Sequence, residues 1–62
     1  MNKYGIWNEI EDVQEVKNYD TEQVIEFANI ERVAVTGVKE EITTLAEAED
    51  FLITLGYTVE EM

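Results

Sequence analysis

Carboxylates are the main side chains in this sequence that could carry out acid–base or metal chemistry. Fifteen of the 62 residues are Asp or Glu. Groupings that could act together are Glu40-Glu41, Glu60-Glu61 and the cluster Glu9, Glu11 and Asp12. Paired carboxylates can hydrolyse glycosides, and clustered carboxylates can bind Mg²⁺ or Ca²⁺. The glycine of a calcium-binding loop is missing from the acidic cluster, so we expect a solvated acidic surface and no metal.

The other usual catalytic groups are absent. The sequence contains no Ser, Cys or His, which excludes the Ser-His-Asp and Cys-His arrangements. Zinc, haem and iron–sulfur sites lack their usual ligands, and each of the three glycines stands alone, so no glycine-rich phosphate loop exists. A chain this short also leaves little room for a cleft of about 300–1,000 Å³. We therefore predict that the protein is not an enzyme and holds no cofactor.

The balance of charge limits the partners. Fifteen acids against four bases give a net charge of −11 and a pI of about 4.1. The only bases are Lys3, Lys17, Arg32 and Lys39, and the last three each lie within two residues of an acid. Nucleic acids and anionic membranes should therefore repel the chain. Apolar runs such as Val33-Ala34-Val35 are too short for an export signal or a membrane span. We expect a cytoplasmic domain that attracts basic protein surfaces.

The clearest element is a helix over residues 45–55. Thr44 is a suitable N-cap, and Glu47 three residues later completes the pattern of a capping box. Gly56 can adopt the left-handed conformation that ends many helices. After this helix, residues 57–59 could add a short edge strand.

A second helix is expected over residues 21–28, where Asp20 and Gln23 form another capping box. Between the two helices, alternating apolar and polar residues and a central glycine predict a hairpin of residues 32–36 and 39–43.

Residues 3–18 allow two interpretations. Residues 3–7 look like a strand, and residues 9–17 fit either a helix or, after a turn at 8–11, a second strand over 12–17. The second interpretation makes the chain a repeated strand–strand–helix unit. We favour this ββαββα-like fold, an antiparallel sheet with two helices packed on one face, within a single acidic α+β domain covering residues 1–62. The alternative is three helices plus a β-hairpin.

The acidic surface is the strongest functional signal. A net charge of −11 exceeds the roughly 2–8 common for a small soluble domain, and charge of one sign steers association with an oppositely charged surface. We predict a binding protein that inhibits a basic, nucleic-acid-handling partner, because carboxylates on helices can occupy sites meant for phosphates. The candidate contact residues are Glu22, Glu26, Glu40, Glu41, Glu47, Glu49 and Asp50, with Ile53 as an apolar anchor.

In size and charge, the chain resembles the small acidic inhibitors that phages and mobile elements carry against host nucleases, restriction systems, CRISPR effectors or polymerases. This resemblance implies a DNA-mimic surface and a class of partner, and it assigns no role to single residues.

Two alternatives remain open. In one, the chain is a structural module that forms a homodimer through the exposed hairpin edge or through an apolar spot at Ala46 and Ile53, and the charge only keeps it soluble. In the other, it is an acidic antitoxin or an anti-sigma-like regulator that neutralises a basic partner encoded nearby.

Overall fold

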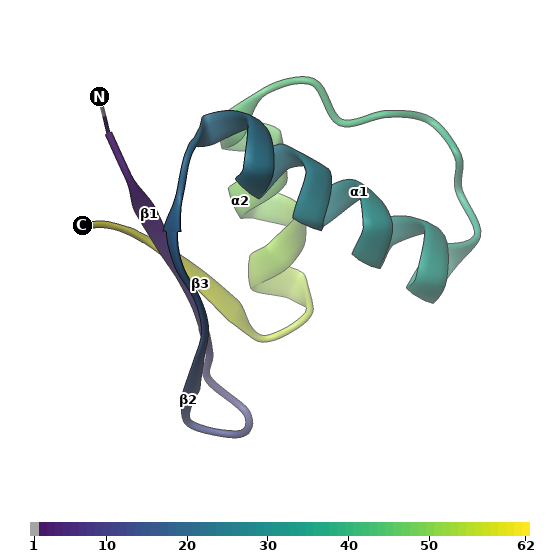
Figure 1. The fold of residues 1–62 in the computed structure, drawn as a ribbon. Coiled ribbons are helices and arrows are strands. Elements are labelled where there is room, and N and C mark those ends of the chain that lie inside the picture. The colour runs from purple at the N-terminus through teal and green to yellow at the C-terminus, as the bar shows by residue number, and fades with distance from the viewer. Residues whose placement is uncertain (1) are drawn as a thin grey trace.

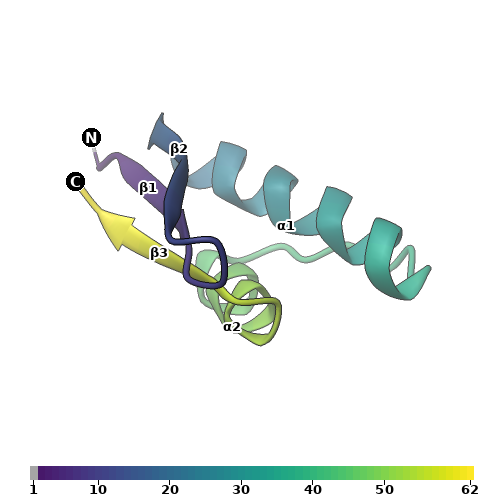
Figure 2. The same cartoon turned by 90° about the horizontal axis from the view of Figure 1, so that it is seen from below.

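The computed structural model describes residues 2–62 and has five elements, joined in the order β–β–α–α–β. They are β1 (Tyr4–Asn8), β2 (Val13–Tyr19), α1 (Thr21–Thr36), α2 (Leu45–Thr54) and β3 (Tyr57–Glu61). The strands form one antiparallel sheet in the order β2-β1-β3. Both helices lie on the same face of this sheet (Figures 1 and 2). The α+β class, the antiparallel sheet and the two helices are therefore confirmed.

The N-terminal segment is a hairpin, as the strand interpretation of residues 12–17 predicted. The side-chain oxygen of Asn8 accepts hydrogen bonds from the backbone N–H groups of Ile10 and Glu11, both at 3.0 Å, and Asp12 has a φ of 57°. Such bonds occur both in turns and at helix starts, but the left-handed conformation of Asp12 ends the turn, so a helix over residues 9–17 does not continue. β2 pairs irregularly with β1, with register shifts on either side of Ile6.

The predicted edge strand at residues 57–59 is also present, and it extends to Glu61. It pairs with β1 in regular register, from Tyr4 opposite Glu61 to Asn8 opposite Tyr57. The N-terminal strand is therefore the centre of the sheet, and the C-terminal strand is one edge.

The predicted hairpin between the helices is wrong. Residues 32–36 are the last turns of α1, which runs to Thr36, and residues 37–43 form an irregular loop. Gly37 has a φ of 74°, and its N–H donates to the carbonyl of Val33 at 3.0 Å. Such a glycine can turn a hairpin or end a helix, and here it ends a helix. Consequently, neither the second strand pair of ββαββα nor the three-helix alternative occurs among residues 2–62.

Both predicted helix starts are confirmed. The Asp20 side chain accepts from the N–H of Gln23, whose side chain accepts in return from the N–H of Asp20. At α2, the Thr44 hydroxyl accepts from the N–H of Glu47 at 3.2 Å.

The core lies between the helices and the sheet. Its buried residues come from β1, both helices and the loop; they are Tyr4, Ile6, Val24, Ala28, Ile42, Ala48 and Leu52. Phe27 and Tyr57 pack edge to face beside this core, with ring centroids 5.5 Å apart. Burial of these side chains, at roughly 25 cal/mol per Å² of apolar surface, is the main source of stability.

Candidate functional site

The structure divides the predicted contact carboxylates between two surfaces. Glu22 and Glu26 lie on α1, and Glu40 and Glu41 lie in the loop beside it; all four side chains are exposed. The other three predicted acids lie on α2, where Glu47 and Asp50 are exposed and Glu49 is half-buried. The first group borders hollows beside α1, whereas the second lies on α2.

The loop of residues 37–43 is tied to α1 by an amide clamp. The Asn29 side-chain amide nitrogen donates to the Ile42 carbonyl at 3.1 Å, and the Ile42 N–H donates to Asn29 Oδ1 at 2.7 Å. Ile42 itself is buried in the core, and Arg32 Nη1 donates to the Glu40 carbonyl at 3.3 Å. The loop therefore forms a fixed wall beside the helix.

Two hollows lie between α1 and this wall. One, of about 450 Å³, is bordered by Glu22, Glu26, Ile30 and Glu41 among other residues. The next, of about 370 Å³, is bordered by Ile30, Val33, Glu40 and Glu41 in part. Because Asn29, Ile30 and Glu41 border both hollows, the two lie next to each other along α1, and we call the pair the groove.

A third hollow, of about 230 Å³, lies on the other side of α1. It is bordered by Tyr19, Gln23, Glu26, Phe27 and Ile30. Glu26 and Ile30 therefore have a hollow on both sides, so they stand out as a crest.

We call Glu22, Glu26, Ile30 and Val33 the α1 ridge. At 3.6 residues per turn these four positions fall within an arc of about 80°. The arc lies opposite the side of α1 that buries Val24 and Ala28. The ridge therefore faces outward, with two carboxylates toward the start of the helix and two aliphatic side chains toward its end.

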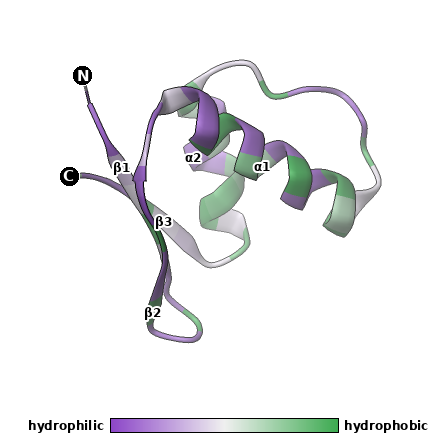
Figure 3. Cartoon of the chain, viewed as in Figure 1, coloured by the Kyte–Doolittle hydropathy of each residue, from purple (hydrophilic) through white to green (hydrophobic). Residues whose placement is uncertain are grey.

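The aliphatic half of the ridge was not predicted from the sequence. Ile30 is 62% exposed and Val33 is 47% exposed. Val35 lies on the core-facing side of α1 and is nevertheless exposed, because the last turns of the helix extend beyond the sheet and α2 (Figures 1 and 3). Assigning residues 32–36 to a strand separated Val33 from Ile30 and hid the shared face.

The predicted apolar spot on α2 is exposed. Ile53 is 61% exposed and Ala46 is exposed as well, and no element among residues 2–62 covers them. Ile53 thus matches Ile30 in residue type and exposure while lying on the other helix.

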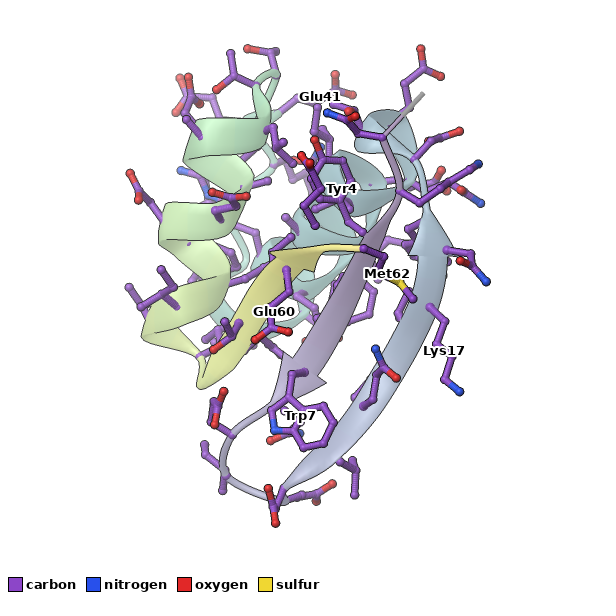
Figure 4. The ribbon with its side chains drawn as sticks, turned by 90° about the vertical axis from the view of Figure 1, so that its left-hand side faces the viewer. Tyr4, Trp7, Lys17, Glu41, Glu60 and Met62 are labelled. Carbon is purple, nitrogen blue, oxygen red and sulfur yellow. The ribbon has the colours of Figure 1, made fainter. Side chains whose placement is uncertain are left out.

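The carboxylates of the C-terminal strand and of the first turn are spread over different parts of the surface. Glu60 lies on the uncovered face of the sheet with Trp7 (Figure 4), and since side chains alternate along a strand, Glu61 points to the opposite face. Glu9 Oε1 accepts a hydrogen bond from the Thr58 hydroxyl at 3.0 Å. In the described part of the chain, no group of three acidic side chains is arranged to hold a metal ion.

The hydroxyl of Tyr57 has a shifted pKa. Partial burial raises the pKa of the Tyr57 hydroxyl above its ordinary value, and the negative charges of Glu31, Glu15 and Glu11 raise it further. The negative potential of this protein therefore extends to the side where α1 approaches the sheet.

No helix in the part of the chain that the structure describes combines the length and the apolar character needed to cross a membrane. No known family model matches the chain, and no curated protein or solved structure is significantly similar to it.

Proposed function

We propose that the protein is a binding domain that engages a basic protein and inhibits it by presenting carboxylates in place of nucleic-acid phosphates. The observation that carries this proposal is the grouping of Glu22, Glu26, Glu40 and Glu41 around an outward-facing groove of α1. These four carboxylates come from two segments that the Asn29 clamp holds together, so the backbone positions that carry them are set before any partner binds.

Electrostatics supports this choice of partner. With a net charge of −11, the chain repels phosphates and attracts lysine- and arginine-rich surfaces, and such surfaces are common on proteins that handle nucleic acids. A bound acidic domain would then exclude the nucleic acid from the same surface. Direct nucleic-acid binding by this chain is not part of the proposal.

The test uses the immobilised full chain to retain proteins from a lysate of the cells in which it occurs, followed by release with salt. Each retained basic protein is then mixed with labelled duplex DNA, and the displacement of DNA by the wild-type chain is measured. We expect displacement, and we expect it to weaken strongly when Glu22, Glu26, Glu40 and Glu41 are all replaced by Gln. If the wild-type chain displaces no DNA, the phosphate-mimic proposal is wrong. If the fourfold variant displaces DNA as well as the wild type does, these four carboxylates are not the surface that binds.

A second candidate function is a homo-oligomeric module, which the exposure of Ile53 and Ala46 favours. Light scattering at micromolar concentration distinguishes the homo-oligomeric module from the binding domain. A dimer that dissociates in the Ile53→Asp variant would support assembly through α2, whereas a monomer would contradict it. The predicted hairpin edge no longer offers a route to this dimer, because the hairpin is absent.

A further inference from the structure

We propose that the α1 ridge and its flanking hollows form a docking site for one amphipathic helix of the partner, with lysine or arginine in one half and aliphatic side chains in the other. The inference rests on the proposed function and specifies where the partner binds and what it presents. It also assigns a binding role to Ile30 and Val33.

The shape of the surface favours a helix. Glu22, Glu26 and Ile30 are spaced four residues apart, which is the row of side chains that forms a ridge on a helix, and Val33 follows three residues after Ile30. Hollows of about 450 and 370 Å³ lie on one side of this ridge and one of about 230 Å³ lies on the other. A second helix packs by inserting its own ridges into grooves of this kind.

The length of the surface sets the length of the occupant. From Glu22 to Val33 the helix rises about 17 Å, at 1.5 Å per residue. A partner helix of about 12 residues spans the same distance. The wall of the groove does not need to be built on binding, since Asn29 and Arg32 already hold the loop against α1.

The chemistry changes along the ridge. Toward the start of α1, Glu22 and Glu26 stand one turn apart and repel each other, with Glu41 bordering the same hollow. Toward the end, Ile30 and Val33 are outward-facing aliphatic side chains, beside Glu40 on the loop. Basic side chains opposite the first half relieve the repulsion, and aliphatic side chains opposite the second half remove apolar surface from water.

The charges favour a foreign basic helix over a second copy of this chain. Lys39 borders the groove near Val33, and it is outnumbered by Glu22, Glu26, Glu40 and Glu41. Pairing two copies would bring together two domains of net charge −11 each. A cationic partner is instead attracted by the negative potential of this chain.

The test titrates the isotope-labelled full chain with a synthetic helix-forming peptide of about 14 residues. Lysines occupy one face in its first half, and leucines continue that face in its second half. A control peptide has the same composition, with lysines and leucines distributed so that no face is shared. We expect NMR shift changes centred on the α1 ridge for the first peptide and at least about tenfold weaker binding of the control.

Two matched variants decide whether the ridge is the site. Ile30→Asp and Ile53→Asp make the same change at side chains that are 62% and 61% exposed, and each adds one negative charge. We expect Ile30→Asp to weaken peptide binding about tenfold or more, and Ile53→Asp to leave it within about twofold. Equal effects of the two variants, or equal binding of the two peptides, would overturn the docking site.

The proposed function and the docking site can fail separately. If the Glu47→Gln/Asp50→Asn variant loses basic partners while Glu22→Gln/Glu26→Gln keeps them, acidic binding survives and the ridge is the wrong place. If the chain is a dimer that Ile30→Asp dissociates, the ridge is covered by a second copy and the partner-helix proposal is wrong.

Discussion

At the scale of single residues, Asn29 is the side chain on which the groove depends most. It pairs with both polar backbone groups of Ile42, a residue that is 3% exposed. A buried backbone group left without a partner costs about 1–3 kcal/mol, so this one amide both anchors the loop and keeps a core residue in place.

We predict that Asn29→Ala destabilises the protein by about 2 kcal/mol or more, because it leaves the N–H and the carbonyl of Ile42 unpaired. Asn29→Asp should have a smaller effect, since the carboxylate still accepts from the Ile42 N–H but cannot donate to its carbonyl. Urea denaturation followed by tryptophan fluorescence measures both. Equal stability of Asn29→Ala and the wild type would contradict the role of the clamp.

A second residue-scale prediction concerns Tyr57. Its pKa is raised in the folded state, so folding favours the neutral hydroxyl. The resulting stability is fully present below the unfolded pKa of about 10 and is lost as the pH rises through the higher folded value. We expect the Tyr57→Phe variant to lose less stability than the wild type across this range. Denaturation midpoints of the variant and the wild type at pH 9 and above pH 10 test it, and an equal loss in both would contradict the role of Tyr57.

At the scale of elements, the sequence predicted well where the signals were local. Both capping-box patterns marked true helix starts, and the turn predicted at residues 8–11 lies between two strands one residue later, at 9–12. The end of α1 was missed because Val33 and Val35 alternate as they would in a strand, and because Gly37 suits either a hairpin or a helix end. Only a contact between distant residues, Asn29 with Ile42, shows that residues 38–43 form a loop beside a helix.

In the candidate site, too, the sequence indicated local features and missed those that depend on distant residues. The eight candidate contact residues were chosen for their charge or expected exposure, and the pattern could not show that Glu40 and Glu41 border a groove shared with Glu22 and Glu26. That grouping depends on where the loop returns, which no local spacing encodes.

The element-scale prediction concerns the end of α1. Gly37 has a φ of 74° with no atom near the place of a side chain, so the strain of a substitution there comes from the backbone alone. We expect Gly37→Ala to destabilise the protein by about 1 kcal/mol, and Gly37→Asn by less, because Asn tolerates the left-handed conformation. Denaturation midpoints test the order, and the same stability for both variants would contradict it.

At the scale of the whole molecule, the net charge of −11 on a chain with a Cα radius of gyration of 10.8 Å is the dominant feature. Like charges in a compact domain repel one another, and salt screens them over about 10 Å at 0.1 M. The repulsion among its carboxylates therefore lowers the stability of the isolated domain.

We predict that the urea midpoint rises when NaCl is increased from about 20 mM to about 500 mM, as the Debye length shortens from roughly 20 Å to less than 5 Å. The variant with Gln at positions 22, 26, 40 and 41 should have a higher urea midpoint than the wild type at low salt. Its midpoint should also rise less as NaCl is increased. An unchanged midpoint for the wild type would show that repulsion does not limit its stability.

The pairing of β1 with β3 has a mechanical consequence. Tyr4 lies opposite Glu61, and the N–H of Met62 donates to the carbonyl of Lys3, so the two ends of the described chain leave the sheet side by side (Figure 1). A force that pulls these ends apart loads one hydrogen-bonded pair at a time and opens the strands like a zipper. In a circular permutant with these ends joined and new ends in the loop of residues 37–41, the same force would act on the two helices and not directly on the β1–β3 pair. The natural order of the strands therefore gives this domain a low resistance to a force that pulls its two ends apart.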